Sequence, residues 1–85
     1  MKTFKDLEFE NHHSGSGLQA VMEFPNRYGI SVVKFRGSYG YRERLWEAAV
    51  FYEGKITYDT ELTDDVLGYQ TEENITELMK QIQSL

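Results

Sequence analysis

The fold is decided between residues 18 and 35, where the sequence reads LQAVMEFPNRYGISVVKF. The apolar residues Leu18, Ala20, Met22 and Phe24 alternate with Gln19, Val21 and Glu23. The Pro-Asn pair at 25–26 then ends the pattern. This period of two is typical of a half-buried β-strand, and the β-branched and aromatic run at 30–35 also favours a strand. We therefore predict an antiparallel hairpin with residues 24–29 as its loop.

A second hairpin is predicted further along the chain. Residues 45–52 alternate in the same way, and the Glu-Gly pair at 53–54 is typical of a tight turn. Residues 55–58 are expected to return as a fourth strand. An irregular or edge strand is also expected near the start of the chain, around Phe4, Leu7 and Phe9.

The clearest helix is predicted at the end of the sequence. Its apolar residues recur at the spacing of one helix face, and they are Ile75, Leu78, Met79, Ile82 and Leu85. Thr71 is the candidate N-cap, and the two glutamates that follow it suit the positive end of the helix dipole. Asn74 stands where a full capping box has Glu or Gln.

Residues 63–68, which read TDDVLG, predict one capped helical turn closed by Gly68. Val66 and Leu67 are expected to cover the edge of the sheet. Two hairpins followed by a helix with one apolar stripe predict an α+β fold. We expect a single domain over residues 1–85, in which an antiparallel sheet of about four strands is packed on one face by the C-terminal helix.

The charge of the chain is unevenly distributed. The 85 residues include no cysteine and carry a net charge of −5, but residues 27–44 hold all four arginines and a net +4, whereas residues 53–77 carry −7. These two regions either pair with each other or form separate faces. The lack of cysteine, of a signal peptide and of a long apolar stretch predicts a cytoplasmic protein without membrane association. A chain this small is expected to be a monomer or a homodimer.

One segment stands out as a candidate binding site. Residues 36–44 read RGSYGYRER and join the two predicted hairpins. Tyrosine and arginine are over-represented in binding hot spots, and arginine interleaved with aromatic residues is also typical of proteins that hold single-stranded nucleic acid. The predicted binding residues are Arg36, Tyr39, Tyr41, Arg42 and Arg44. In the competing interpretation, the tyrosines cover the rim of a small core and the arginines pair with nearby acids.

The adjacent histidines His12 and His13 are of a residue type that can bind metals or act as a general base. They lie in a glycine- and serine-rich segment, residues 11–17, which is expected to be a flexible loop that holds neither ring in place. The chain has no third histidine and no cysteine to complete a site. We assign these two residues no chemistry.

Catalytic and metal motifs are likewise not expected. The spacing of the carboxylates in residues 59–65 lacks the glycine and terminal glutamate of a calcium-binding EF-hand loop, so helix capping and solubility explain these acids more simply. They are Asp59, Glu61, Asp64 and Asp65. No serine lies in a nucleophile-elbow context, and the Gly-Ser-Gly run at 15–17 is not followed by the Lys of a phosphate-binding loop. We expect no enzyme activity, no metal and no cofactor.

The sequence at residues 24–33 (FPNRYGISVV) and 58–69 (YDTELTDDVLGY) resembles those of small uncharacterised proteins encoded by bacteriophages and prophages. The likeness spans most of the chain. It carries no activity and no functional residue with it. The resemblance implies a bacterial cytoplasm and a role in phage or prophage biology.

These observations favour a non-enzymatic protein-interaction module, a small adaptor or inhibitor that binds a bacterial or phage protein. The absence of a catalytic motif, the divided charge and the loop at 36–44 motivate this hypothesis. The alternative is a nucleic-acid-binding protein that uses the region from Arg27 to Arg44, where several phosphates would be neutralised.

Overall fold

The central hairpin is confirmed, but its loop is residues 24–27 and not 24–29, because Tyr28 and Gly29 already pair within the sheet. Strand β2 (Leu18–Glu23) pairs antiparallel with β3 (Tyr28–Lys34), and the strand predicted at 45–52 is present as β4 (Trp46–Tyr52) on the other side of β3. These three strands form the centre of an antiparallel sheet.

The structure is a computed structural model that describes residues 1–56 and 66–85. Within these residues the sheet has six strands instead of about four, in the order β1-β2-β3-β4-β5, with β6 also paired to β4. The predicted turn at 53–54 joins β4 to β5, whereas residues 57 and 58 of the expected fourth strand lie outside the described residues. The other elements are η1 (Phe4–Asp6), β1 (Glu10–Asn11), η2 (Tyr41–Glu43), β5 (Lys55–Ile56), β6 (Leu67–Gln70) and α1 (Glu72–Gln83).

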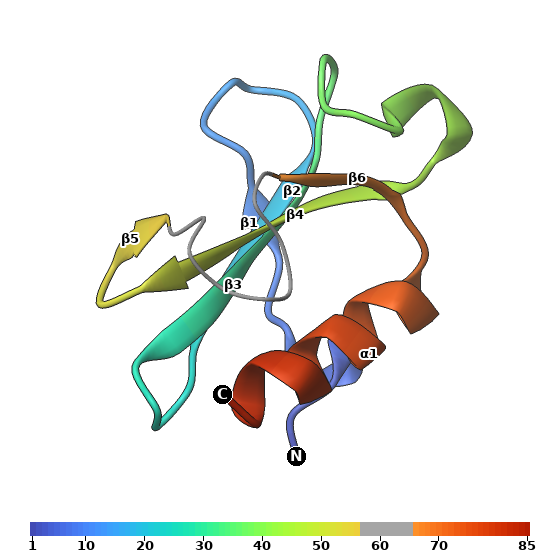
Figure 1. Cartoon of the computed structure of the whole chain (residues 1–85). Coiled ribbons are helices and arrows are strands. Elements are labelled where there is room, and N and C mark those ends of the chain that lie inside the picture. Colours follow the sequence, from blue (N-terminus) through green and yellow to red (C-terminus); the bar gives the residue numbers. More distant parts are fainter. Residues whose placement is uncertain (57–65) are drawn as a thin grey trace.

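Helix α1 packs against the sheet, mainly over β3, β4 and β6, as Figure 1 shows. The strand register places alternate residues of the central strands on the helix side, where apolar side chains from both layers are removed from water. The largest fully buried side chains are Ile30, Val32, Val50, Ile75, Met79 and Ile82. The predicted α+β architecture, an antiparallel sheet packed by one C-terminal helix, is therefore confirmed.

The start of α1 is capped more completely than expected. The Thr71 hydroxyl oxygen accepts the Asn74 backbone N–H at 3.0 Å, and the Asn74 side-chain oxygen accepts the Thr71 backbone N–H at 3.1 Å. Asn74 therefore closes a capping box in place of Glu or Gln. Leu85 does not belong to the buried stripe, because the helix ends at Gln83 and this side chain is 45% exposed. Within the described residues, no helix is both long and apolar enough to cross a lipid bilayer.

The expectation of a strand around residues 4–9 is wrong in detail. Phe4 begins a 3-10 turn, whose first residues are fixed by a hydrogen bond from Thr3 N–H to the Asp6 carboxylate at 2.8 Å. The turn directs Phe4 and Phe9 toward Trp46, with ring centroids 5.4 and 4.6 Å from the Trp46 ring. This aromatic cluster covers one end of the core, and only the two residues of β1 join the sheet.

The predicted helical turn closed by Gly68 is also wrong where the structure describes it. Leu67 and Gly68 belong to strand β6, in which Leu67 pairs with Ala48 of β4 and packs against the core. Pairing with a distant strand has overridden the local capping pattern. Residues 63–65 of the predicted turn lie outside the described residues.

We predict that replacing a fully buried helix residue will remove a large share of the stability. Ile75 is 0% exposed, and Ile75→Ala should lower the free energy of unfolding by about 2–5 kcal/mol, because it removes apolar contacts and leaves a cavity. Urea unfolding measures this change. Leu85→Ala, at the exposed end of the same predicted stripe, should change the urea midpoint little. Equal losses of unfolding free energy in the two variants would contradict the observed packing.

Candidate functional site

The candidate loop at residues 36–44 is anchored at its start by a buried serine. The Ser38 hydroxyl donates to the Phe35 carbonyl oxygen at 2.7 Å and accepts the Phe35 backbone N–H at 3.0 Å. Ser38 is 7% exposed, so these hydrogen bonds are shielded from water. Further along, the backbone N–H groups of Glu43 and Leu45 both donate to the Gly40 carbonyl oxygen at 3.0 Å. The loop has a defined conformation.

The loop lies against strand β6, which follows it by about thirty residues in the sequence (Figure 1). The Tyr69 backbone N–H donates to the Tyr39 carbonyl oxygen at 3.3 Å. Gly68 approaches Tyr39 so closely that a Cβ on residue 68 would overlap the Cβ of Tyr39. Glycine at position 68 is therefore required for this contact.

Strand β6 contains a bulge that places a third tyrosine beside the loop. Trp46 pairs with Gln70 and Ala48 pairs with Leu67, so β6 has one residue more than β4 between these pairs. Tyr69 lies in this interval with φ +58°, a left-handed conformation that is uncommon for a residue other than glycine. Its side chain is 58% exposed. Bulges often redirect a side chain near a functional site, which is consistent with this arrangement.

Together these segments form a hollow of about 660 Å³, which we call the tyrosine–arginine hollow, lined by residues 36–43 and Tyr69. Tyr39 and Tyr41 are 61% and 38% exposed, so neither ring covers the core rim as a buried side chain would. Exposed rings grouped on one surface are the arrangement that the binding hypothesis expects.

The structure brings four of the five predicted binding residues to this hollow. Arg36 and Arg42 line it together with Tyr39 and Tyr41, whereas Arg44 is not among the lining residues. Arg44 instead ends η2 in the left-handed conformation, with φ +60°. That these residues bind a partner remains a prediction.

The cationic side chains at the hollow are not neutralised by ion pairs within the described part of the chain. Over residues 1–56 and 66–85 the one ion pair joins Arg27 to Glu53, with 2.9 Å between Nη1 and Oε1. The carboxylate of Glu47 contacts the loop through its backbone, since Oε1 accepts the Tyr39 backbone N–H at 3.1 Å. Pairing between the basic and acidic regions is thus limited, among these residues, to Arg27 and Glu53.

The expectation that the loop at 11–17 holds neither histidine ring is wrong for His12. Its ring stacks on Phe35 with centroids 4.0 Å apart and planes at 5°, and the residue is only 6% exposed. Nδ1 lies 2.8 Å from the Ser14 hydroxyl oxygen. The His13 ring centroid is 4.1 Å away, and among the described residues no group of three or more His, Asp or Glu is placed to hold a metal ion. The acids Asp59, Glu61, Asp64 and Asp65 lie outside the described residues.

The close His12–Ser14 pair has the spacing of a base and a nucleophile, but its surroundings indicate a local turn. The Ser14 backbone N–H also donates to Nδ1 at 3.1 Å, and the Ser14 hydroxyl donates to the Ser16 carbonyl oxygen at 3.2 Å. Within the described residues no carboxylate is hydrogen-bonded to the other ring nitrogen to orient the base, as catalytic pairs require. The pair organises the turn.

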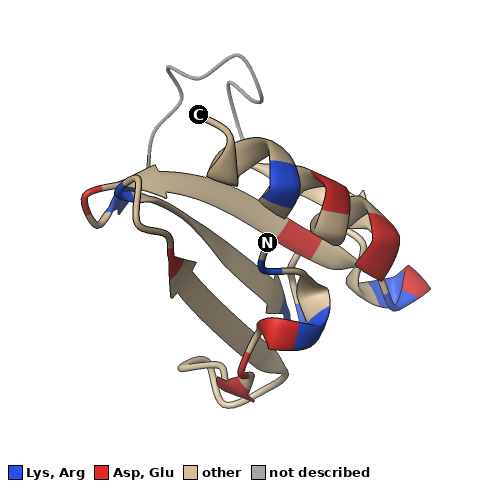
Figure 2. Ribbon diagram, turned by 90° about the horizontal axis from the view of Figure 1, so that it is seen from below, with Lys and Arg blue, Asp and Glu red and all other residues tan. Residues whose placement is uncertain are grey.

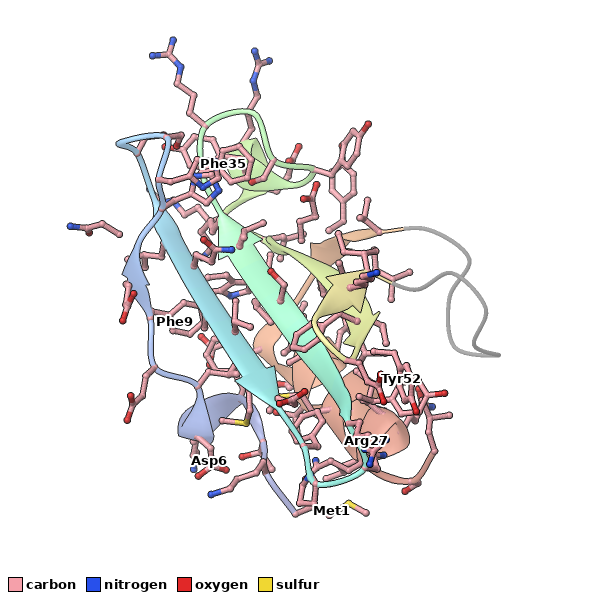
Figure 3. The ribbon with its side chains drawn as sticks, turned by 90° about the vertical axis from the view of Figure 1, so that its left-hand side faces the viewer. Met1, Asp6, Phe9, Arg27, Phe35 and Tyr52 are labelled. Atoms are coloured by element: carbon pink, nitrogen blue, oxygen red, sulfur yellow. The ribbon has the colours of Figure 1, made fainter. Side chains whose placement is uncertain are left out.

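This turn also supports the start of the candidate loop. The Arg36 backbone N–H donates to the Ser16 hydroxyl oxygen at 3.3 Å, and a Cβ at Gly17 would overlap the Lys34 carbonyl group. Figure 3 shows Phe35, the stacking partner of His12, at one end of the sheet, with Arg27 and Tyr52 at the opposite end. The turn formed by residues 12–16 therefore contacts the loop that lines the tyrosine–arginine hollow.

Sequence reasoning missed two contributors to this region, Tyr69 and His12. Tyr69 was expected to follow a helical turn, and nothing in its local sequence indicates pairing with β4 or contact with Tyr39. The one available signal was the glycine at position 68, which is compatible with a close backbone approach as well as with a helix end.

No protein-family model matches the chain, and no similar curated protein or solved structure was found.

We predict that Gly68→Ala will displace the loop while leaving the core intact. The added methyl group overlaps Tyr39, so the loop must move, at a cost of about 1–3 kcal/mol typical of overpacking. Backbone NMR shifts should change most at residues 36–43 and little in β2. Gly54→Ala, where no atom lies within 4 Å of an added Cβ, should leave the shifts of residues 36–43 unchanged. Unchanged shifts at Tyr39 in Gly68→Ala would contradict the contact.

We also predict that acid will weaken the fold through His12. Burial, and to a lesser extent the nearby His13, lowers the pKa of His12 below its ordinary value of 6.5. The unfolded chain then binds this proton more readily, so the contribution is complete above about pH 6.5 and falls as the pH decreases toward the folded-state pKa. Urea midpoints should fall less in His12→Phe, which keeps a stacked ring without a titrating group. The same fall in both proteins between about pH 7.5 and 5.5 would contradict the prediction.

Proposed function

We propose that this protein is a non-enzymatic protein-interaction module that acts in a bacterial cytoplasm as a small phage-type adaptor or inhibitor. The observation that carries the proposal is the grouping of three exposed tyrosines, Tyr39, Tyr41 and Tyr69, with Arg36 and Arg42 around one hollow. Tyrosine and arginine are enriched among the residues that dominate binding energies.

The hydrogen-bonded conformation of the loop supports the proposal. Ordering a side chain or loop on binding costs free energy, so a surface that is already ordered retains more of its contact energy. Ser38 fixes the start of the loop, and the Tyr39–Tyr69 backbone hydrogen bond fixes its middle. The tyrosines are therefore presented on a preorganised surface.

The strained backbone at Tyr69 also supports a binding role. A left-handed conformation costs a residue with a side chain roughly 1–2 kcal/mol compared with the right-handed region, and such strain is concentrated at functional sites. Glycine would avoid this cost at position 69, but it would remove an exposed ring from the hollow. An exposed ring in this conformation is what a contact with a partner would require, and this supports the proposal without being unique to Tyr69, since Arg27, Arg44 and Glu53 also have positive φ.

Nucleic-acid binding is the second candidate, and one observation favours it. Arg36 and Arg42 make no ion pair within residues 1–56 and 66–85, and they lie beside exposed aromatic rings that can stack on bases. The net charge of −5 opposes this candidate, because the rest of the chain repels a polyanion.

We predict that a tagged wild-type protein will retain a specific protein from nuclease-treated bacterial lysate and that Tyr39→Ala/Arg42→Ala will not. Truncation of two hot-spot residues should weaken binding by at least about 2 kcal/mol, enough to lose the partner on washing. Tyr52→Ala/Lys55→Ala is the matched control, since it removes one exposed tyrosine and one cation away from the hollow. Tyr52 lies at the opposite end of the sheet from Phe35 (Figure 3), and Lys55 pairs with it across the β4–β5 turn.

A third variant, Tyr69→Gly, separates binding from stability. It relieves the left-handed strain while removing the ring, so the protein should remain folded and still lose its partner. Retention of the same protein by wild type and by all three variants would remove the tyrosine–arginine hollow from the proposal. Retention of nucleic acid alone, before nuclease treatment, would favour the second candidate.

A further inference from the structure

We propose that the partner presents an acidic segment in which carboxylates flank an apolar or aromatic side chain, and that this segment occupies the tyrosine–arginine hollow. This inference deepens the proposed function and rests on it. It follows from the charge, the ring exposure and the extent of the hollow.

The positive charge of the hollow favours a partner that carries carboxylates. Arg36 and Arg42 line it as exposed cations without an ion pair among the described residues, and Arg44 adds a third exposed cation close by in the chain. Glu43 is the one acid in the lining. A guanidinium binds a carboxylate with two parallel hydrogen bonds, which gives both attraction and orientation. A neutral partner would leave these donors facing water.

The exposed tyrosine rings favour a partner that also has an apolar or aromatic side chain between its carboxylates. Tyr39, Tyr41 and Tyr69 come from two segments and contribute both ring surface and hydroxyl groups to one hollow. Aromatic pairs add about 0.5–1.5 kcal/mol beyond the burial of their surface. Removing these rings from water requires a partner group that enters the hollow, and a carboxylate alone does not provide that surface.

The limited extent of the positive surface favours a short acidic segment over nucleic acid. The cations of the site fall within residues 36–44, whereas the chain carries −5 in total. The first half of α1 carries three acids, Glu72, Glu73 and Glu77, and the red bands on this helix are visible in Figure 2. A long polyanion would extend beyond the hollow and meet this negative charge. An acidic segment of a folded protein ends within the hollow, so it is attracted with less repulsion elsewhere.

Fluorescence anisotropy with three labelled probes tests the inference. The probes are a short peptide that alternates Glu with Leu and Phe, the same peptide with every Glu replaced by Gln, and an oligothymidylate of similar length. We expect wild type to bind the Glu peptide about tenfold more tightly than the Gln peptide, with weaker binding as NaCl rises from about 50 to about 500 mM. Arg36→Gln/Arg42→Gln should lose this preference, and Lys55→Gln/Lys80→Gln, which removes two cations outside the hollow, should keep it.

Equal affinity for the Glu and Gln peptides, or no binding of the Glu peptide by folded wild type, would overturn the acidic-partner inference. So would tighter binding of the oligothymidylate that is lost in Arg36→Gln/Arg42→Gln, since it would assign the hollow to nucleic acid. The lysate experiment keeps the two proposals separate. A partner that is lost in Tyr39→Ala/Arg42→Ala and in Tyr69→Gly, but retained by Arg36→Gln/Arg42→Gln at high salt, would overturn the acidic partner and leave the protein-interaction module standing.

Discussion

The close approach of Gly68 to Tyr39 is the contact on which the candidate site depends. It brings strand β6 against a loop about thirty residues earlier, and it is held by the hydrogen bond from Tyr69 N–H to the Tyr39 carbonyl oxygen. Without it, the loop would carry two tyrosines and its arginines but would have no opposing wall. With it, a third ring completes a hollow of about 660 Å³.

The position of β6 is set in turn by the core. Gln70 ends β6 and Thr71 caps α1, so no linker separates the strand from the helix. Helix α1 is fixed on the sheet by side chains that are fully removed from water, Ile75, Met79 and Ile82. The burial of these side chains therefore also holds Tyr69 beside the loop. A small domain has a modest net stability, so the same few contacts serve both the fold and the site.

The parts of the fold that were predicted from sequence are those whose signal is local. The hairpin at 18–35, the strand at 45–52 and the capped helix after Thr71 each show their own periodicity and end signals, and all three are present. Residues 67–70 show a capping pattern instead of alternation, and their strand exists only because β4 offers a partner. The binding loop was located by composition, yet Tyr69 and the stacked His12 were missed because their partners, Tyr39 and Phe35, are distant in sequence.

The most direct test of the account is a nuclear Overhauser measurement on labelled protein, between the Gly68 Hα protons and the Tyr39 Hβ protons. The structure predicts strong cross-peaks between them, since a Cβ on residue 68 would overlap the Tyr39 side chain. Absence of these cross-peaks, in a protein whose β2–β3 hairpin cross-peaks are intact, would contradict the docking of the loop on β6. The tyrosine–arginine hollow, and both proposals built on it, would then lose their structural basis.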